Sequence, residues 1–176
     1  EETRPNVIHI VTPPQSHLPL VELAAAYGCH CYVEKPFASN ADDARKILAV
    51  ATAALIRVCP GHNRLFQPEF QEAQRRIRAG EIGRVVSVRA EQGYSYEGVA
   101  RAAEIPWSYR DDFGILDNLL CHPLYMATHF LAQPGPPRVL AYSLNRISEA
   151  GVEEVRVTIP SREAAAEVSL TMNAHP

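Results

Sequence analysis

The sequence predicts an α/β fold: the C-terminal half of a doubly wound parallel sheet, followed by an α+β domain with a largely antiparallel sheet. In the first third of its 176 residues, short β-branched runs alternate with helical patterns, the order typical of parallel sheets with right-handed crossovers. In the last third, strand-like runs follow one another without long helices between them, which favours antiparallel pairing. We place the two domains at residues 1–60 and 61–176.

The first domain is expected to begin with a strand over residues 7–11. This run is apolar on both faces, as suits a parallel strand covered by helices. Ser16 is expected to cap the helix that follows, and Gly28 to end it. The elements expected next are a strand over residues 29–33, a helix over residues 41–54 capped by Asn40, and a strand over residues 55–59.

The pattern changes after Arg64. Pro68 suits the first turn of a helix that ends near Ala79. The elements expected after it are a strand from residue 85 to about residue 91, an apolar helical stretch over residues 113–131 interrupted by Pro123, and strands over residues 138–146, 152–159 and 165–172.

Composition excludes several classes of protein. The chain has 17 basic and 20 acidic residues and a formal net charge of -3, which disfavours a nucleic-acid binder. Its hydrophobic content of 47% disfavours intrinsic disorder. No apolar run approaches the roughly 18 residues of a membrane span. We therefore expect neither nucleic acid nor a membrane as a partner.

The cysteines indicate a reducing, cytoplasmic compartment, because the chain shows no secretory signal. Cys29 and Cys31 lie too close along an extended strand to bond each other easily. Together with His30 they could form half of a metal site, but the sequence has no second Cys-x-x-Cys or His-x-x-x-His. Buried strand cysteines are the better interpretation, and we expect no metal.

Glu34-Lys35-Pro36 is the first candidate site, because it stands where a parallel strand ends and doubly wound sheets bind their ligands at that edge. A lysine in a cleft can hold an alkoxide, or lose its proton when desolvated. A cis bond before Pro36 would fix the turn. The alternative is a solvated charge pair. Only two of the 17 basic residues are lysines, Lys35 and Lys46, which favours a specific use for this amine.

The turn from Thr12 to His17 is the second candidate. Its backbone amides and the start of the following helix would suit a phosphate or a polarised ring amide. The alternative is an ordinary proline-rich turn between a strand and a helix, and this segment alone does not decide between them.

Asn118, His122 and Tyr125 form the third candidate, because positions i, i+4 and i+7 share one face of a helix. Histidine titrates near neutrality and can act as a general acid or base. The alternative is a satisfied core histidine in a well-packed helix, and the residues alone favour that alternative.

Several segments match a known family in order and spacing. They are Val11-Thr12-Pro13-Pro14-x-x-His17, Tyr32-Val33-Glu34-Lys35-Pro36-Phe37-Ala38, Gly61-His62-Asn63-Arg64-Leu65-Phe66-x-Pro68 and Gly80-Glu81-Ile82-Gly83-Arg84-Val85, followed by Trp107 and the helix that carries His122. Through these segments most of the chain resembles the Gfo/Idh/MocA oxidoreductases.

The resemblance implies an N-terminal Rossmann domain that binds NAD or NADP, and a C-terminal α/β domain whose sheet builds homo-oligomers, dimers or tetramers. It implies hydride transfer between the nicotinamide and a sugar, polyol or related carbonyl substrate. The residues it places at the cofactor are Thr12, Pro13, Pro14, His17, Glu34, Lys35, Pro36, Asn63, Arg64, Trp107 and Arg110. The residues it places at the substrate are Lys35, Asn118, His122 and Tyr125, of which Lys35, Asn118 and His122 are expected to be catalytic and His122 to accept the proton.

Two positions depart from the family pattern. The family's usual Asp four residues before the histidine is Asn118 here, and the usual Asp three residues after it is Tyr125. An Asn cannot be an acidic partner, so it can only hydrogen-bond a substrate or orient His122. These departures leave open an alternative: a non-catalytic or regulatory module that keeps the fold without turnover.

The Gly-x-Gly-x-x-Gly turn that holds the pyrophosphate in dinucleotide folds is absent from the sequence. We therefore expect the chain to be an internal piece of a longer enzyme, lacking that turn and the C-terminal end. On this expectation, the 176 residues by themselves bind NAD(P) poorly and are inactive.

Overall fold

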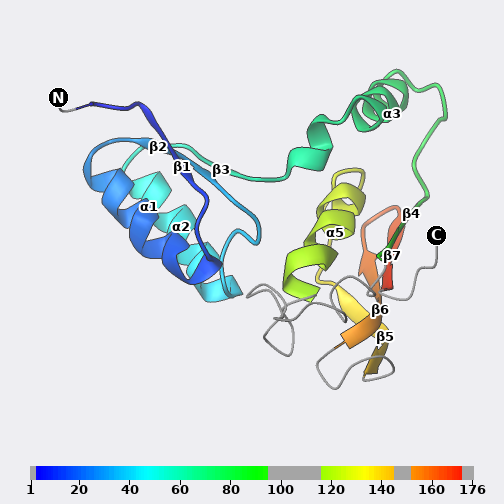
Figure 1. The fold of residues 1–176 in the computed structure, drawn as a ribbon. Coiled ribbons are helices and arrows are strands. Elements are labelled where there is room, and N and C mark those ends of the chain that lie inside the picture. Colours follow the sequence, from blue (N-terminus) through cyan, green and yellow to red (C-terminus); the bar gives the residue numbers. More distant parts are fainter. Residues whose placement is uncertain (1–2, 95–115, 145–151, 172–176) are drawn as a thin grey trace. The chain divides into compact units, whose positions relative to one another are not determined.

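Three short strands form a parallel sheet in the computed structural model, which describes residues 3–94, 116–144 and 152–171 (Figure 1). They are β1 (Val7–Ile10), β2 (His30–Val33) and β3 (Val58–Pro60), in the order β1-β2-β3. The helices α1 (His17–Ala26) and α2 (Ala41–Ala53) are the crossovers between them and pack side by side. These elements make up the first of two compact units, Glu1–His62 and Asn63–Pro176.

The two helices of the first unit begin differently. Asn40 caps α2 as predicted, because its side-chain oxygen accepts a hydrogen bond from the Asp43 amide at 2.9 Å. The predicted cap at Ser16 is wrong. A 3-10 turn, Pro14–Ser16, precedes α1 and gives Ser16 a helical backbone. Its hydroxyl instead donates to the Pro13 carbonyl at 2.8 Å.

The third strand is shorter than predicted. It begins at Val58 rather than at residue 55, because Leu55 has a φ of +56° and closes the end of α2. Leu55 is also 89% exposed, so it belongs to the turn and not to the buried strand.

The second unit contains a four-stranded mixed sheet in the order β4-β7-β6-β5. Its strands are β4 (Ser87–Gly93), β5 (Arg138–Leu144), β6 (Val152–Pro160) and β7 (Ala165–Thr171). Strand β6 is antiparallel to both of its neighbours, and β4 joins β7 in parallel. The expected α/β class with a parallel sheet and a largely antiparallel second sheet is confirmed.

The described helical elements of the second unit are two α-helices and two irregular turns. The α-helices are α3 (Pro68–Arg78) and α5 (Cys121–Thr128). The irregular turns are the 3-10 turn η2 (Asn63–Phe66) and the π-helical turn η4 (Leu116–Leu120). Pro123 is the third residue of α5, which follows directly on the π-helical turn η4, and proline has no backbone N–H to donate within this helical segment. Helix α5 packs against β4 and β7.

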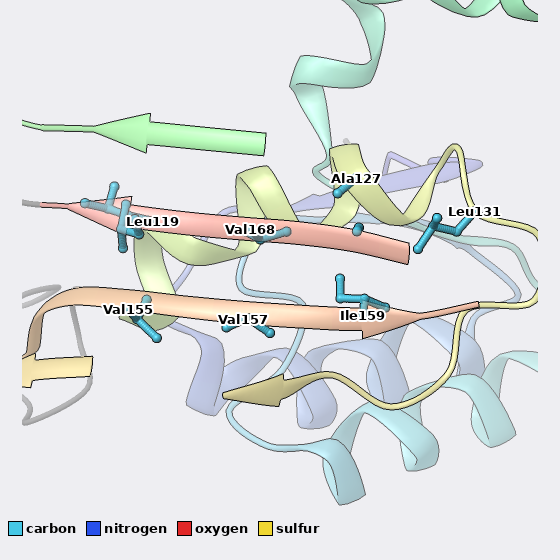
Figure 2. Close-up of a cluster of buried hydrophobic side chains, with 9 residues drawn as sticks. Leu119, Ala127, Leu131, Val155, Val157, Ile159 and Val168 are labelled. Atoms are coloured by element: carbon cyan, nitrogen blue, oxygen red, sulfur yellow. The ribbon is translucent and has the colours of Figure 1, made fainter. Parts of the chain in front are cut away.

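A hydrophobic core holds α5 to this sheet (Figure 2). Val155, Val157 and Ile159 occupy alternate positions of β6 and belong to the same buried cluster as Val168 of β7. Ala127 of α5 is 1% exposed and packs into the same cluster. The period of two along β6 therefore fixes which face of the sheet carries the helix.

The four cysteines are free thiols, and Cys29 and Cys31 are buried in the first unit as predicted. Burial raises the pKa of the Cys31 thiol, and the neighbouring Cys29 adds to this effect. Within the described ranges, none of the helices is both long and apolar enough to cross a membrane.

Candidate functional site

Three loops of the first unit leave its sheet at the same edge. Residues 11–13 follow β1, residues 34–37 follow β2, and Gly61 follows β3. Because the three strands are parallel, their carboxyl ends share this edge, where such sheets bind ligands. The edge therefore collects the first two candidate segments of the sequence, which lie far apart along the chain.

The His17 side chain ties two of these loops together. It is fully buried, and its Nε2 lies 2.8 Å from the Thr12 carbonyl oxygen while its Nδ1 lies 3.2 Å from the Phe37 carbonyl oxygen. A neutral ring has one N–H, and the shorter distance places it on Nε2. Both ring nitrogens thus contact backbone carbonyl groups, so His17 holds the loop after β1 and the loop after β2 together.

The Thr12–Pro14 turn itself is open to solvent. Thr12 and Pro13 are exposed and Pro14 is half-buried. The Thr12 and Ser16 hydroxyls lie 2.6 Å apart, which joins the turn to the start of α1. The turn therefore stands at a helix N-terminus with exposed groups, as an anion or amide site requires.

Glu34 and Lys35 are held by the backbone around them. The Glu34 amide donates to the Ile10 carbonyl at 2.9 Å, and the Glu34 carboxylate accepts from the Lys35 amide at 3.0 Å. The bond between Lys35 and Pro36 is cis. Both charged side chains are half-buried at the sheet edge.

Gly61 approaches this segment closely. Its amide donates to the Val33 carbonyl at 2.7 Å. A Cβ on Gly61 would lie 3.1 Å from the Tyr32 hydroxyl and 3.3 Å from the Cα and Cδ atoms of Glu34. A side chain there would displace the Glu34 carboxylate, so the glycine keeps this carboxylate in place.

In the second unit, Arg64 of η2 is anchored to the end of β4. Its Nη2 donates to the Tyr94 hydroxyl at 3.0 Å. The Gln92 amide, oriented with its oxygen toward Arg64, accepts from Nη1 and Nη2 at 2.5 and 2.6 Å. These charge-assisted contacts join the Arg64 side chain of η2 to the end of β4 within the second unit.

The Arg64 backbone contacts Tyr125, which in turn contacts the candidate histidine His122. The Arg64 amide donates to the Tyr125 hydroxyl oxygen at 3.3 Å, and this oxygen lies 2.8 Å from Nδ1 of His122. The two rings meet edge to face at 70° with centroids 5.5 Å apart. His122 and Tyr125 are 7% and 8% exposed, so their hydrogen bond is shielded from water.

Asn118 lies in the π-helical turn before α5, four residues before His122. Asn118 therefore lies on the π-helical turn η4, whereas His122 and Tyr125 both lie on the α-helix α5. Asn118 is half-buried. The structure brings Arg64, His122 and Tyr125 into one hydrogen-bonded cluster.

Asn63 is exposed at the start of η2. The predicted positions Trp107 and Arg110 lie outside the described residues. Within the part of the chain that the structure describes, no group of three acidic, histidine or cysteine side chains could hold a metal ion.

Sequence patterns do not single out Gln92 and Tyr94, although both belong to the Arg64 cluster. The available signal is their spacing: two polar-tipped side chains at i and i+2, at the end of a strand, face the same side of the sheet. The role of Gly61 could not be predicted from the sequence, because Pro60-Gly61 is also typical of an ordinary strand end.

Two protein-family models match this chain. A model described as the GFO/IDH/MocA C-terminal domain matches residues 70–175. A second, described as an oxidoreductase family with an NAD-binding Rossmann fold, matches residues 1–62.

Curated relatives agree. A D-xylose dehydrogenase from Paenarthrobacter nicotinovorans is 32% identical over 56% of this chain and 26% of its own length. A D-apiose dehydrogenase from Paraburkholderia graminis is 30% identical over 86% of this chain and 39% of its own length. The chain therefore spans well under half the length of these relatives.

A solved structure shares the fold. The oxidoreductase from Agrobacterium radiobacter in complex with NAD+, L-tartaric acid and magnesium has a TM-score of 0.85. It is 21% identical, and the match covers 97% of this chain and 49% of that one. With family models matching both of its units, the chain belongs to the Gfo/Idh/MocA family of oxidoreductases.

Proposed function

We propose that the protein containing this chain is an NAD(P)-dependent oxidoreductase that acts on a carbon of a sugar, polyol or related carbonyl compound. The observation that carries the proposal is the meeting of the Thr12–Pro14 turn, Glu34-Lys35-Pro36 and Gly61 at one sheet edge in a chain of this family. The relatives named D-xylose dehydrogenase and D-apiose dehydrogenase support the substrate class.

The residues at that edge fit a nicotinamide cofactor. The Thr12–Pro14 turn offers exposed groups at the start of α1, and Gly61 leaves room beside the Glu34 carboxylate. When bound, the cofactor would accept or deliver the hydride. The residues proposed to contact it are Thr12, Pro13, Pro14, Glu34, Lys35, Pro36, Asn63, Arg64, Trp107 and Arg110. His17 contributes by holding the turn, since both of its ring nitrogens face backbone carbonyls.

Three residues are proposed to act on the substrate. The Lys35 ammonium would bind the reacting hydroxyl and stabilise the negative charge that develops on its oxygen. His122 would take the hydroxyl proton during alcohol oxidation, and return it during carbonyl reduction. Asn118 would bind a neighbouring hydroxyl, because its amide can both donate and accept.

We also propose that the protein forms a homo-oligomer through the second sheet and works in the cytoplasm. Support for the oligomer comes from the outer strand β5, where Val139 is 62% and Leu140 60% exposed. Support for the compartment comes from the four free thiols.

The two lysines of the chain provide a matched test. Lys46 forms an ion pair with Asp43 on α2, and its side chain is exposed. In the protein at its full natural length, Lys35→Ala should abolish turnover of a panel of aldoses and polyols while NADH or NADPH binding, followed by fluorescence, persists. Lys46→Ala should keep both. Full turnover by Lys35→Ala would refute the role of this lysine.

A non-catalytic module is the second candidate, favoured by Asn118 and Tyr125 at the two positions where the family resemblance implies acidic residues. It predicts cofactor binding without cofactor reduction. Reduction of NAD+ or NADP+ by any member of the panel, lost in Lys35→Ala, would exclude it.

A further inference from the structure

The side chain of His17 lies between two loops of the first unit and has no surface in contact with solvent. It belongs to the first residue of α1, and its exposed fraction is 0%. A polar side chain buried this completely needs partners within the protein, because water does not reach it. The atoms that face its two ring nitrogens therefore decide what the residue does.

Two carbonyl oxygens, one from each loop, face the ring of His17. Nε2 lies 2.8 Å from the Thr12 oxygen, and Nδ1 lies 3.2 Å from the Phe37 oxygen. Thr12 follows β1, and Phe37 follows β2 two positions after Lys35. The ring thus spans from the proposed cofactor turn, Thr12–Pro14, to the loop of residues 34–37, named the Lys35 loop below.

Each loop is also held on its own side. The Ser16 amide donates to the Pro13 carbonyl at 3.0 Å, which closes the turn onto the start of α1. The Glu34 amide donates to the Ile10 carbonyl at 2.9 Å, which joins the ends of β1 and β2. Beyond this bond, His17 bridges the two loops with a planar ring whose nitrogens keep a fixed separation.

We propose that His17 is a positioning residue that sets the separation between the cofactor turn and the Lys35 loop, with Nε2 serving the turn and Nδ1 serving the loop. A neutral ring gives its one N–H to the Thr12 oxygen, so the Phe37 side of the bridge depends on the body of the ring. The ring then determines where Lys35 stands relative to a bound cofactor. This meaning for catalysis rests on the proposed function, whereas the spacing of the loops does not.

Two amide substitutions separate the two sides of the bridge. In His17→Gln the amide nitrogen can take the place of Nε2, so the bond to Thr12 is kept and the contact with Phe37 is lost. In His17→Asn the amide nitrogen can take the place of Nδ1, so the contact with Phe37 is kept and the bond to Thr12 is lost. Both variants place a neutral amide in the same buried position, so a general loss of stability affects them alike.

Hydrogen exchange followed by mass spectrometry tests the spacing in the protein at its full natural length, without cofactor or substrate. In His17→Gln we expect faster exchange in residues 34–38 and unchanged exchange in residues 11–16. In His17→Asn we expect the opposite pattern. Equal changes in both segments of both variants would overturn the proposal.

His30→Gln is the matched control. His30 begins β2, at the other end of this strand from Lys35, and its Nδ1 accepts a hydrogen bond from the Arg57 amide at 3.2 Å. The substitution is chemically the same as His17→Gln, and it should leave exchange in both segments unchanged.

In an active enzyme the two variants should affect different kinetic constants. His17→Asn should raise KM for NAD+ or NADP+ about tenfold, as expected for the loss of one buried hydrogen bond, and leave kcat close to that of the unsubstituted protein. His17→Gln should lower kcat about tenfold and leave this KM unchanged, because the lysine is displaced while the turn is kept. Parallel losses of both constants in both variants would contradict the proposal.

An NMR measurement needs no substitution and covers a variant that does not fold. With ¹⁵N-labelled histidine, the ring N–H of His17 should exchange slowly with solvent, and the ring protons should show nuclear Overhauser contacts to both Thr12 and Phe37. Contacts to only one of the two would overturn the bridge. These results are separable from the proposed function, since a protein without turnover can show the expected spacing and an active enzyme can lack it.

Discussion

Gly61 is a residue where the absence of a side chain has a defined geometric purpose. The Cβ of Gly61→Ala would meet the Glu34 carboxylate group and the Tyr32 hydroxyl within 3.3 Å, so the carboxylate must move. We expect this variant to fold but to bind NADH or NADPH at least about tenfold more weakly, a loss of about 1.4 kcal/mol, by fluorescence titration.

Gly80→Ala is the matched control for that substitution. Gly80 has a φ of +75° and open space around it, so alanine there should cost about 1 kcal/mol of stability through backbone strain. It should leave cofactor affinity unchanged. Equal affinity for the cofactor in both variants would refute the role of Gly61.

His62 predicts a pH dependence of stability. Burial lowers the pKa of its imidazole below 6.5 in the folded protein. The unfolded chain therefore binds a proton first as pH falls, and stability is lost between pH 6.5 and the lower folded pKa, while above that window it is fully present. In urea unfolding at about pH 7 and about pH 5, His62→Gln should lose less stability than the unsubstituted protein. An equal loss would contradict this account.

At the scale of elements, α3 carries an exposed ion network. Glu72 binds both Arg75 and Arg76, and Arg75 also reaches Glu81. Hydrogen bonds from Arg75 and then Arg76 lower the pKa of the Glu72 carboxyl to about 2. Its support for the helix is therefore present above pH 4.5 and lost as pH falls toward 2.

The network predicts a titration that NMR of side-chain carboxyl carbons can follow. Glu72 should titrate near pH 2 at low salt, and nearer its usual range in Arg75→Ala. Because the side chains are exposed, about 1 M salt should have a similar effect by screening. Titration of Glu72 at its usual pH in the unsubstituted protein would contradict the network.

The sequence predicts the elements well where periodicity and caps coincide. The Asn40 cap, the two crossover helices and the antiparallel β6 follow from pattern alone. The prediction from sequence fails where the local backbone conformation determines the element boundary. The 3-10 turn before α1 prevents Ser16 from capping that helix, and the positive φ of Leu55 moves the start of β3 further along the chain. The π-helical turn η4 has no distinct pattern in the sequence, because its apolar residues also fit an α-helix.

The candidate site can likewise be predicted from the sequence only in part. The loops at the strand ends follow from topology, since a parallel sheet must bring them to one edge. The Arg64 anchor on Gln92 and Tyr94 does not, because it joins residues from η2 and β4 through side-chain geometry. The contact of Tyr125 with Nδ1 likewise depends on which way two rings turn.

For assembly of the protein, the outer strand β5 is the surface that we propose for self-association. Among the described strands β5 lies at the edge of its sheet, and its exposed Val139 and Leu140 place apolar side chains along that edge. Val139→Lys should shift the protein toward the monomer in sedimentation experiments, whereas Arg89→Lys on β4 should not. Unchanged assembly in Val139→Lys would exclude β5 as the interface.

The proposed reaction is hydride transfer, and the transfer of deuterium from substrate to cofactor measures it. The full-length protein is incubated with NAD+ or NADP+ and pools of aldoses and polyols deuterated at carbon, and the reduced cofactor is analysed by mass spectrometry. We predict reduced cofactor carrying one deuterium from the substrate carbon, formed by the unsubstituted protein and by Lys46→Ala but not by Lys35→Ala. Absence of deuterated cofactor from every pool, with cofactor binding intact, would contradict the oxidoreductase and leave the non-catalytic module.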